Sequence, residues 1–295
     1  CAASFFFIFL TRERVQQTIE KPSLKQGFKA ILNNYPILLI TLSDFLSGFG
    51  ISQGRSDYFI DVLGSATLQT IVGIPAGPVS NISYALIKPI RRRFSTKAIW
   101  IMEDLYTDMC WLGVFGIGSL NKNFTKRKVM VPVFMLEEFI EMWVYGLRKV
   151  IPAELYNEAM DYCEWKNGYR MEAMTSVARG LIGKLQGIGM NTVKNLVLAE
   201  IGYIQGKAIG TQALRTKWWL FALGTGVPII TSSLGIVPKF FYPLKGDRRD
   251  RMYADLLERR RQMAERVTNA DAEELERIAK AEIRGEYVKN RSLDE

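Results

Sequence analysis

Apolar residues gather in six long stretches between residues 35 and 241, and short polar segments separate them. The stretches cover residues 35–53, 66–87, 98–120, 129–147, 182–203 and 218–238. A helix that crosses a bilayer needs about 20 mostly apolar residues, and each stretch approaches that length. The pattern therefore predicts an all-α membrane protein with six membrane-spanning helices in residues 35–241. The second and sixth stretches contain no charged residue, whereas the other four do.

The same pattern divides the two ends of the chain. Residues 1–10 are apolar and begin at Cys1 without the basic region of a signal peptide, so we interpret them as the truncated end of a further transmembrane helix. Residues 11–34 are polar, contain five basic residues and predict a cytoplasmic connecting loop with some helix. Residues 242–295 predict a charged cytoplasmic tail. Its apolar stripe is thin, which favours a solvated helix laced with i,i+4 ion pairs over a docking or regulatory helix.

The distribution of charge indicates a membrane surface rather than nucleic acid. The formal net charge is +9, and the tail contributes none of it because residues 242–295 contain 13 basic and 13 acidic residues. A basic surplus in an apolar region suits anionic lipid. The absence of histidine excludes Ser-His-Asp triads and His-ligated zinc. The three cysteines lie far apart, so we predict no disulfide framework, no metal site and no catalytic residue.

Basic residues in the loops predict an orientation. Residues 11–34 and 88–97 contain five basic residues each, whereas residues 54–65 contain only Arg55. Cytoplasmic loops carry an excess of lysine and arginine, which places the linker and the tail in the cytoplasm. Residues 121–128 oppose this assignment with four basic residues in a loop that would lie outside.

The segment between the fourth and fifth stretches, residues 152–184, reads as a charged, aromatic-rich loop followed by a helix that carries a lysine near its start. Its spaced residues are Glu158, Asp161, Tyr162, Glu164, Trp165, Lys166, Gly168, Arg170 and Lys184. This pattern resembles the glycoside–pentoside–hexuronide:cation symporters, the melibiose-permease-like branch of the major facilitator superfamily. Two departures are visible, because Cys163 replaces the usual glycine and Glu158 the usual aspartate. The segments RERVQQ, RRRFSTK and FFYPLKGDRRDRMYADLLERRRQ extend the resemblance over nearly the whole chain.

The resemblance implies the six-helix C-terminal bundle of a twelve-helix transporter whose N-terminal half is missing from this sequence. It implies cation-coupled symport of a sugar or glycoside by alternating access in a bacterial inner membrane, without enzyme activity. The co-transported Na⁺ or H⁺ would bind mainly in the missing half, and no other cofactor is implied. The expected partners are the bilayer, the solute and the N-terminal half, with no nucleic acid.

The charged residues of the 152–184 segment have a functional and a structural interpretation. Asp161, Glu164, Lys166 and Arg170 are placed to act as a cytoplasmic latch between two transporter states, since charged pairs can hold one state and release in the other. Alternatively, they set membrane topology as solvated loop charges. Lys184 has the same ambiguity. The resemblance implies a coupling role beside the solute and cation sites, whereas a lysine near a helix end can also snorkel to lipid headgroups.

Acidic and aromatic residues recur at helical spacing in the third and fourth stretches, where charge is costly unless it faces a cavity or a partner. These candidate cavity-lining residues are Asp104, Asp108, Glu137, Glu141, Trp143, Tyr145 and Arg148. They would line a substrate path, with Trp143 and Tyr145 stacking on a sugar ring. Equally, they would form an ion-pair network between helices, with Glu141 bound to Arg148 or Lys149. The sequence does not separate these alternatives.

Two other functions remain open on the same sequence. Sodium-coupled transport of lipid or another solute is compatible with the same fold, although the many acids in the third and fourth stretches argue against an apolar cargo. A transporter-derived sensor or scaffold would bind a ligand without uptake and act through its tail. Both differ from sugar symport in what crosses the membrane.

Overall fold

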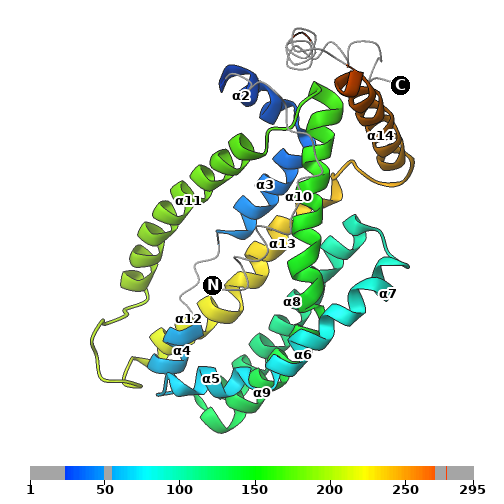
Figure 1. Cartoon of the computed structure of the whole chain (residues 1–295). Coiled ribbons are helices and arrows are strands. Elements are labelled where there is room, and N and C mark those ends of the chain that lie inside the picture. The colour runs from blue at the N-terminus through cyan, green and yellow to red at the C-terminus, as the bar shows by residue number, and fades with distance from the viewer. Residues whose placement is uncertain (1–23, 50–54, 270–276, 278–295) are drawn as a thin grey trace, which may run out of the picture.

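The computed structural model describes residues 24–49, 55–269 and 277, and these residues form helices and connections without any β-strand (Figure 1). The predicted all-α fold is confirmed for this part of the chain. The predicted helix end at residues 1–10, the first part of the linker and most of the tail beyond residue 269 lie outside the described residues.

Helices of very different length make up the fold. In chain order they are α2 Leu24–Asn33, α3 Tyr35–Ser47, α4 Arg55–Asp61, α5 Thr67–Gly73, α6 Ala76–Ser83, α7 Ile87–Arg91, α8 Thr96–Ser119, α9 Arg127–Glu141, α10 Tyr145–Asn167, α11 Glu172–Glu200, α12 Leu214–Thr225, α13 Val227–Phe240 and α14 Gly246–Asn269. Short 3₁₀ turns continue three of them: η1 Tyr84–Leu86, η2 Leu120–Thr125 and η3 Met142–Val144. Each predicted apolar stretch falls on one or more of these helices.

Helix ends follow local sequence signals. The Asn34 side chain caps α3 by accepting a 3.2 Å hydrogen bond from the backbone N–H of Ile37, and its amide donates to the Ala159 carbonyl at 2.7 Å. The Ser95 hydroxyl caps α8 in the same way, through the Ala98 N–H. Because the Asn34 cap also binds α10, it positions α3 against the rest of the molecule.

Apolar length alone identifies few membrane spans among the described residues. One continuous unit, Leu214–Phe240, is long and apolar enough to cross a bilayer, with a mean hydropathy of 1.8. The pair Thr67–Gly73 and Ala76–Arg91 would form a second span, bent by 43° at the break that contains Pro75. These two units contain most or all of residues 218–238 and 66–87, the two predicted stretches without a charged residue.

The segment from residue 152 to residue 167 is helical, so the prediction of a loop there was wrong. It extends α10 without a break to Asn167, where Gly168 at φ 89° ends the helix in the left-handed region that glycine tolerates. The residues concerned are mostly good helix formers, and their charges bind other helices rather than solvent. Only residues 168–171 connect α10 to α11.

Two apolar clusters hold the helices together. One cluster joins α4, α9 and α12 through aromatic rings. The centroid of the Tyr58 ring lies 5.7 Å from that of Phe134 and 5.5 Å from that of Phe221. The other cluster joins α3, α8, α10 and α14, and its largest members are Ile37, Trp100, Ile151, Leu155, Met160, Tyr242 and Met252. The helices α3 and α13 approach closely at Gly235, whose carbonyl accepts from the Ser43 hydroxyl at 2.7 Å.

The helix α11 is the least covered element of the fold. It is 29 residues long, and Thr175 is its one buried residue in a helix that the structure describes completely. Figure 1 shows it along one side of the molecule, where α2 and α3 are its neighbours. Most of its apolar side chains therefore face away from the bundle.

Candidate functional site

The carboxylates of α10 form one acidic face, and arginines from three other segments bind it. Glu154, Glu158, Asp161 and Glu164 are three or four residues apart, a spacing that puts them on the same side of a helix. Their ion-pair partners are Arg91 of α7, Arg249 and Arg260 of α14, and Arg170 of the short connection to α11. The acidic face thus ties the end of α10 to elements that are distant in the sequence.

Arg170 is central to this network. Its Nη1 lies 2.6 Å from Asp161 Oδ1 and 3.7 Å from Glu164 Oε2, and its Nη2 lies 2.7 Å from Glu172 Oε1. The turn at Gly168 reverses the chain so that Arg170 reaches a carboxylate nine residues before it. The structure therefore brings together three of the four residues predicted to form a latch.

The fourth predicted latch residue, Lys166, has a different partner. Its Nζ lies 5.9 Å from the ring centroid of Tyr162, a cation–π distance, and the Tyr162 ring is buried. Tyr162 in turn packs against Trp165, with centroids 5.8 Å apart. Lys166 thus flanks the network through an aromatic side chain and not through a carboxylate.

The tail helix α14 docks on α10, so the interpretation of it as a solvated helix was wrong. Arg260 Nη2 lies 2.9 Å from Asp161 Oδ1 and 2.5 Å from Glu164 Oε2. On the same side of α14, Met252 and Leu256 are fully buried. Hydrogen bonds to Glu164 are the main cause of a raised pKa for Arg260, so this guanidinium stays charged at any physiological pH.

Glu158 is the most deeply buried carboxylate of the acidic face, with 1% of its surface exposed. It accepts a 2.9 Å hydrogen bond from the Tyr242 hydroxyl and forms an ion pair with Arg249. A buried carboxylate needs such partners because an uncompensated buried charge is strongly destabilising. The residue that departs from the expected aspartate thus binds both α14 and the connection between α13 and α14.

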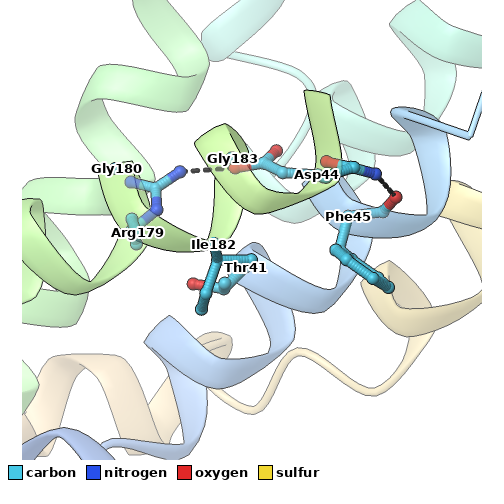
Figure 2. A pocket seen from close by; sticks show the side chains of 8 residues that line it. Thr41, Asp44, Phe45, Arg179, Gly180, Ile182 and Gly183 are labelled. Atoms are coloured by element: carbon cyan, nitrogen blue, oxygen red, sulfur yellow. Dashed lines mark hydrogen bonds and ion pairs between the residues drawn. The ribbon is translucent and has the colours of Figure 1, made fainter. Parts of the chain in front are cut away.

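A pocket of about 340 Å³ lies between α3 and α11, and Figure 2 shows the side chains around it. Its lining residues are Thr41, Asp44, Phe45, Arg179, Gly180, Ile182, Gly183 and Gln186. Arg179 forms an ion pair with Asp44 across the pocket, and the Gln186 amide donates to the Phe45 carbonyl. The guanidinium of Arg179 also lies 5.3 Å from the ring centroid of Tyr156.

Sequence reasoning missed Arg179, and it treated Asp44 only as a charge within a predicted span. A signal was present for Asp44, because it is the one charge in the apolar residues 35–53 and such charges usually have partners. Lys184 lies one residue beyond the pocket-lining Gly183, on the exposed surface of α11. Within the described residues it has no hydrogen bond or ion pair, so its predicted role in coupling stays a prediction.

Two acidic residues, one in α8 and one in α9, each form an ion pair with a cation of another helix. Asp104 pairs with Lys239 of α13, a residue that lies just outside the predicted sixth stretch. Glu141 Oε1 lies 2.7 Å from Arg148 Nη1, which is the pair that the network interpretation predicted. Asp108 accepts a 3.3 Å hydrogen bond from Ser233, and Glu137 is buried beside them.

The two aromatic residues predicted to stack on a sugar pack on other rings here. Trp143 is 36% exposed and meets Phe139 edge-on, with centroids 6.3 Å apart. Tyr145 meets Tyr84 edge-on at 6.2 Å. The Tyr145 contact joins the start of α10 to η1, whereas the Trp143 contact lies between η3 and the adjoining α9.

Comparison with known proteins now gives the family. The family model described as MFS/sugar transport protein matches residues 1–246, more than four fifths of the chain. The chain belongs to this family. The resemblance found in residues 152–184 is thereby confirmed, and the major facilitator membership makes the chain an integral membrane protein.

Relatives of this sugar transport family member are themselves named as carriers of small solutes. The chain is 27% identical over 261 residues to the isoprimeverose transporter of Lactiplantibacillus pentosus, covering 85% of the chain and 51% of that protein. It is 23% identical over 210 residues to the lactose permease of Lactobacillus delbrueckii subsp. bulgaricus, covering 68% and 31%. A putative sulfoquinovose importer of Salmonella typhimurium is 24% identical over 244 residues, covering 80% and 49%. The chain spans about half the length of the curated relatives it matches, or less.

Proposed function

We propose that the complete protein is a secondary active transporter that carries a sugar or glycoside together with a cation by alternating access. The observation that carries this proposal is the family match over residues 1–246, together with relatives named for isoprimeverose and lactose. In this proposal the described helices supply six membrane spans of the C-terminal half. The linker and tail lie in the cytoplasm, and the coupling Na⁺ or H⁺ binds mainly in the other half.

The charge network at the end of α10 supports a gating role. Alternating access rocks two bundles about a site near the membrane midplane, so contacts at one face must form and break in each cycle. Arg170 and Arg260 both bind Asp161 and Glu164, and these carboxylates are about 15% exposed. A guanidinium can exchange among several nearby carboxylates without leaving any of them buried and unpaired. This arrangement suits a latch better than an isolated ion pair does.

The pocket between α3 and α11 supports a solute-proximal role for this part of the chain. It combines polar groups, an ion pair and apolar walls, which is the usual composition of small-molecule sites. Lys184 follows the pocket-lining Gly183 on α11, and it is exposed within the described part of the chain. In this proposal Lys184 acts with acidic groups of the other half in coupling.

Uptake by the complete protein in proteoliposomes tests the proposal. Labelled isoprimeverose and lactose are offered under an inward Na⁺ gradient, an inward proton gradient, or neither. We expect gradient-driven accumulation of at least one sugar, and no accumulation of either under any gradient would refute sugar symport.

Substitutions in the same assay test the assigned residues. We expect Lys184→Ala to abolish accumulation and Lys207→Ala, which changes an exposed loop lysine, to retain it. Full accumulation by Lys184→Ala would reject its coupling role. Asp161→Asn and Arg170→Gln, tested singly, are each expected to slow uptake, and wild-type uptake in both would reject the latch.

A further inference from the structure

Glu103 of α8 is a buried carboxyl group with an unsatisfied oxygen. Glu103 as a whole is 5% exposed, and its Oε2 atom has no hydrogen-bond partner among residues 24–49, 55–269 and 277. Neither Lys239 nor Arg148 forms an ion pair with it in this part of the chain. Since an ionised carboxylate without partners is far costlier to bury than a neutral acid, its environment favours a protonated side chain.

The charges around Glu103 lead to the same conclusion. Its charged neighbours are Asp104 on its own helix, Arg148 of α10 and Lys239 of α13. Lys239 is engaged by Asp104, and Arg148 by Glu141 of α9. The two cations are thus already paired with two carboxylates. The carboxyl groups of Asp108 and Glu137 lie in the same region, so carboxyl groups outnumber the cations there. An additional negative charge on Glu103 would be uncompensated.

Arg148 is placed to change that balance. Its Nη2 donates a 2.9 Å hydrogen bond to Thr107 Oγ1, and Thr107 also donates to the Glu103 backbone carbonyl at 2.9 Å. Thr107 is four residues beyond Glu103, slightly more than one turn or about 6 Å along α8. A joint shift of α9 and α10 by one turn relative to α8 would therefore move the guanidinium from Thr107 to the Glu103 carboxyl, while Arg148 keeps its ion pair with Glu141. One-turn displacements of packed helices are a known mode of switching.

We propose that Glu103 is a proton-binding site of this half of the transporter. The group holds a proton in the present conformation and releases it when Arg148 moves from Thr107 to Glu103. On release, the O–H bond of the carboxylic acid breaks, the proton passes to water, and the carboxylate shares Arg148 with Glu141 as its counter-ion. The site is separate from the cation site of the proposed symport mechanism. Its proton binding follows from its burial in a membrane protein and not from which solute is carried.

Infrared spectroscopy of the complete protein at neutral pH tests this site directly. Protonated carboxylic acids give a C=O stretching band that ionised carboxylates lack, and exposed glutamates are ionised at this pH. We expect Glu103→Gln to remove one such band from the wild-type spectrum. Glu200→Gln, which changes an exposed glutamate at the end of α11, should remove none. The proposal would be overturned if Glu103→Gln kept every C=O band of protonated carboxylic acids and instead lost a band of an ionised carboxylate.

A second variant guards against misfolding of the first. Glu103→Leu replaces the carboxyl with an apolar side chain and should leave the detergent-solubilised protein monodisperse, with an unchanged or higher Tm. If Glu103 were instead an ionised partner of Lys239 or Arg148, leucine would lower the Tm by stranding that cation. Sugar uptake is not needed for either readout. If the wild-type protein shows the Glu103 acid band but no sugar uptake, sugar symport alone is rejected. If it shows sugar uptake but no such band, the proton site alone is rejected.

Discussion

Arg260→Gln tests the docking of the tail helix on α10. The substitution removes three contacts to carboxylates: Arg260 Nε to Glu164 Oε1 at 2.9 Å, Nη2 to Glu164 Oε2 at 2.5 Å, and Nη2 to Asp161 Oδ1 at 2.9 Å. Glutamine retains the helix propensity of arginine closely, so the change acts on these contacts and not on α14 itself.

The structure sets the size of the effect. Hydrogen bonds to charged groups contribute about 1.5–3 kcal/mol when buried, and exposed ion pairs about 0.2–1 kcal/mol. The Arg260 side chain is 42% exposed and its partners about 15%, so we take an intermediate loss of about 1.4 kcal/mol. That loss corresponds to about a tenfold larger undocked fraction. The tail should nevertheless remain docked, because buried Met252 and Leu256 contribute about 1.5–3 kcal/mol each.

Hydrogen–deuterium exchange of the complete protein measures the undocked fraction through the amides of α14. We expect these amides to exchange about tenfold faster in Arg260→Gln, in line with a 1.4 kcal/mol loss. Arg261→Gln is the matched control, since Arg261 is 74% exposed and, among the described residues, forms its ion pair only with Glu265 at 3.1 Å. Its amides should change by less than about threefold, because an exposed i,i+4 pair contributes about 0.3–0.5 kcal/mol. Equal exchange in the two variants would refute docking through Arg260.

Two further predictions concern helix contacts. Asp44→Asn and Arg179→Gln should each reduce sugar uptake by leaving one charge of the α3–α11 pair without its partner, and the double variant should recover part of it. Uptake in the double variant below both single variants would contradict this pairing. Gly235→Val should destabilise the protein by about 1–3 kcal/mol, because even a Cβ would lie 3.0 Å from the Ser43 carbonyl oxygen. Gly187→Ala has open space, so its Tm in detergent should stay near wild type.

The helical class of the fold could be predicted from the sequence because apolar length is a local property. Residues 66–87 and 218–238 were identified by their lack of charge, and they fall on the two units that pass a length and hydropathy test. The end of α10 could not be predicted in the same way. Its charges suggested a solvated loop, whereas Arg249 and Arg260, roughly 90 residues later, neutralise them. Pairings over such distances leave no periodic signal in the chain.

The candidate site shows the same division between local and distant information. Asp161 and Arg170 could be associated from the sequence because they belong to one short motif, and the structure places them 2.6 Å apart. Arg179 and Asp44 are separated by 135 residues, and their contact depends on how α11 lies against α3. Lys239 was missed because it follows the sixth stretch by one residue, although it is the counter-ion of Asp104.

Paired charges also explain why a hydropathy test finds so few spans in a member of a membrane transport family. The helix α8 has 24 residues, about 36 Å at 1.5 Å per residue, which exceeds the roughly 30 Å hydrocarbon core of a bilayer. Glu103, Asp104 and Asp108 lower its mean hydropathy as if each were a free charge. Asp104 is instead neutralised by Lys239, whose Nζ also lies 4.5 Å from the Trp100 ring centroid. Mean hydropathy counts residue types and ignores ion pairs. The helix α8 is therefore long enough to span a bilayer and has Asp104 neutralised, yet its mean hydropathy is too low for it to be recognised as a span.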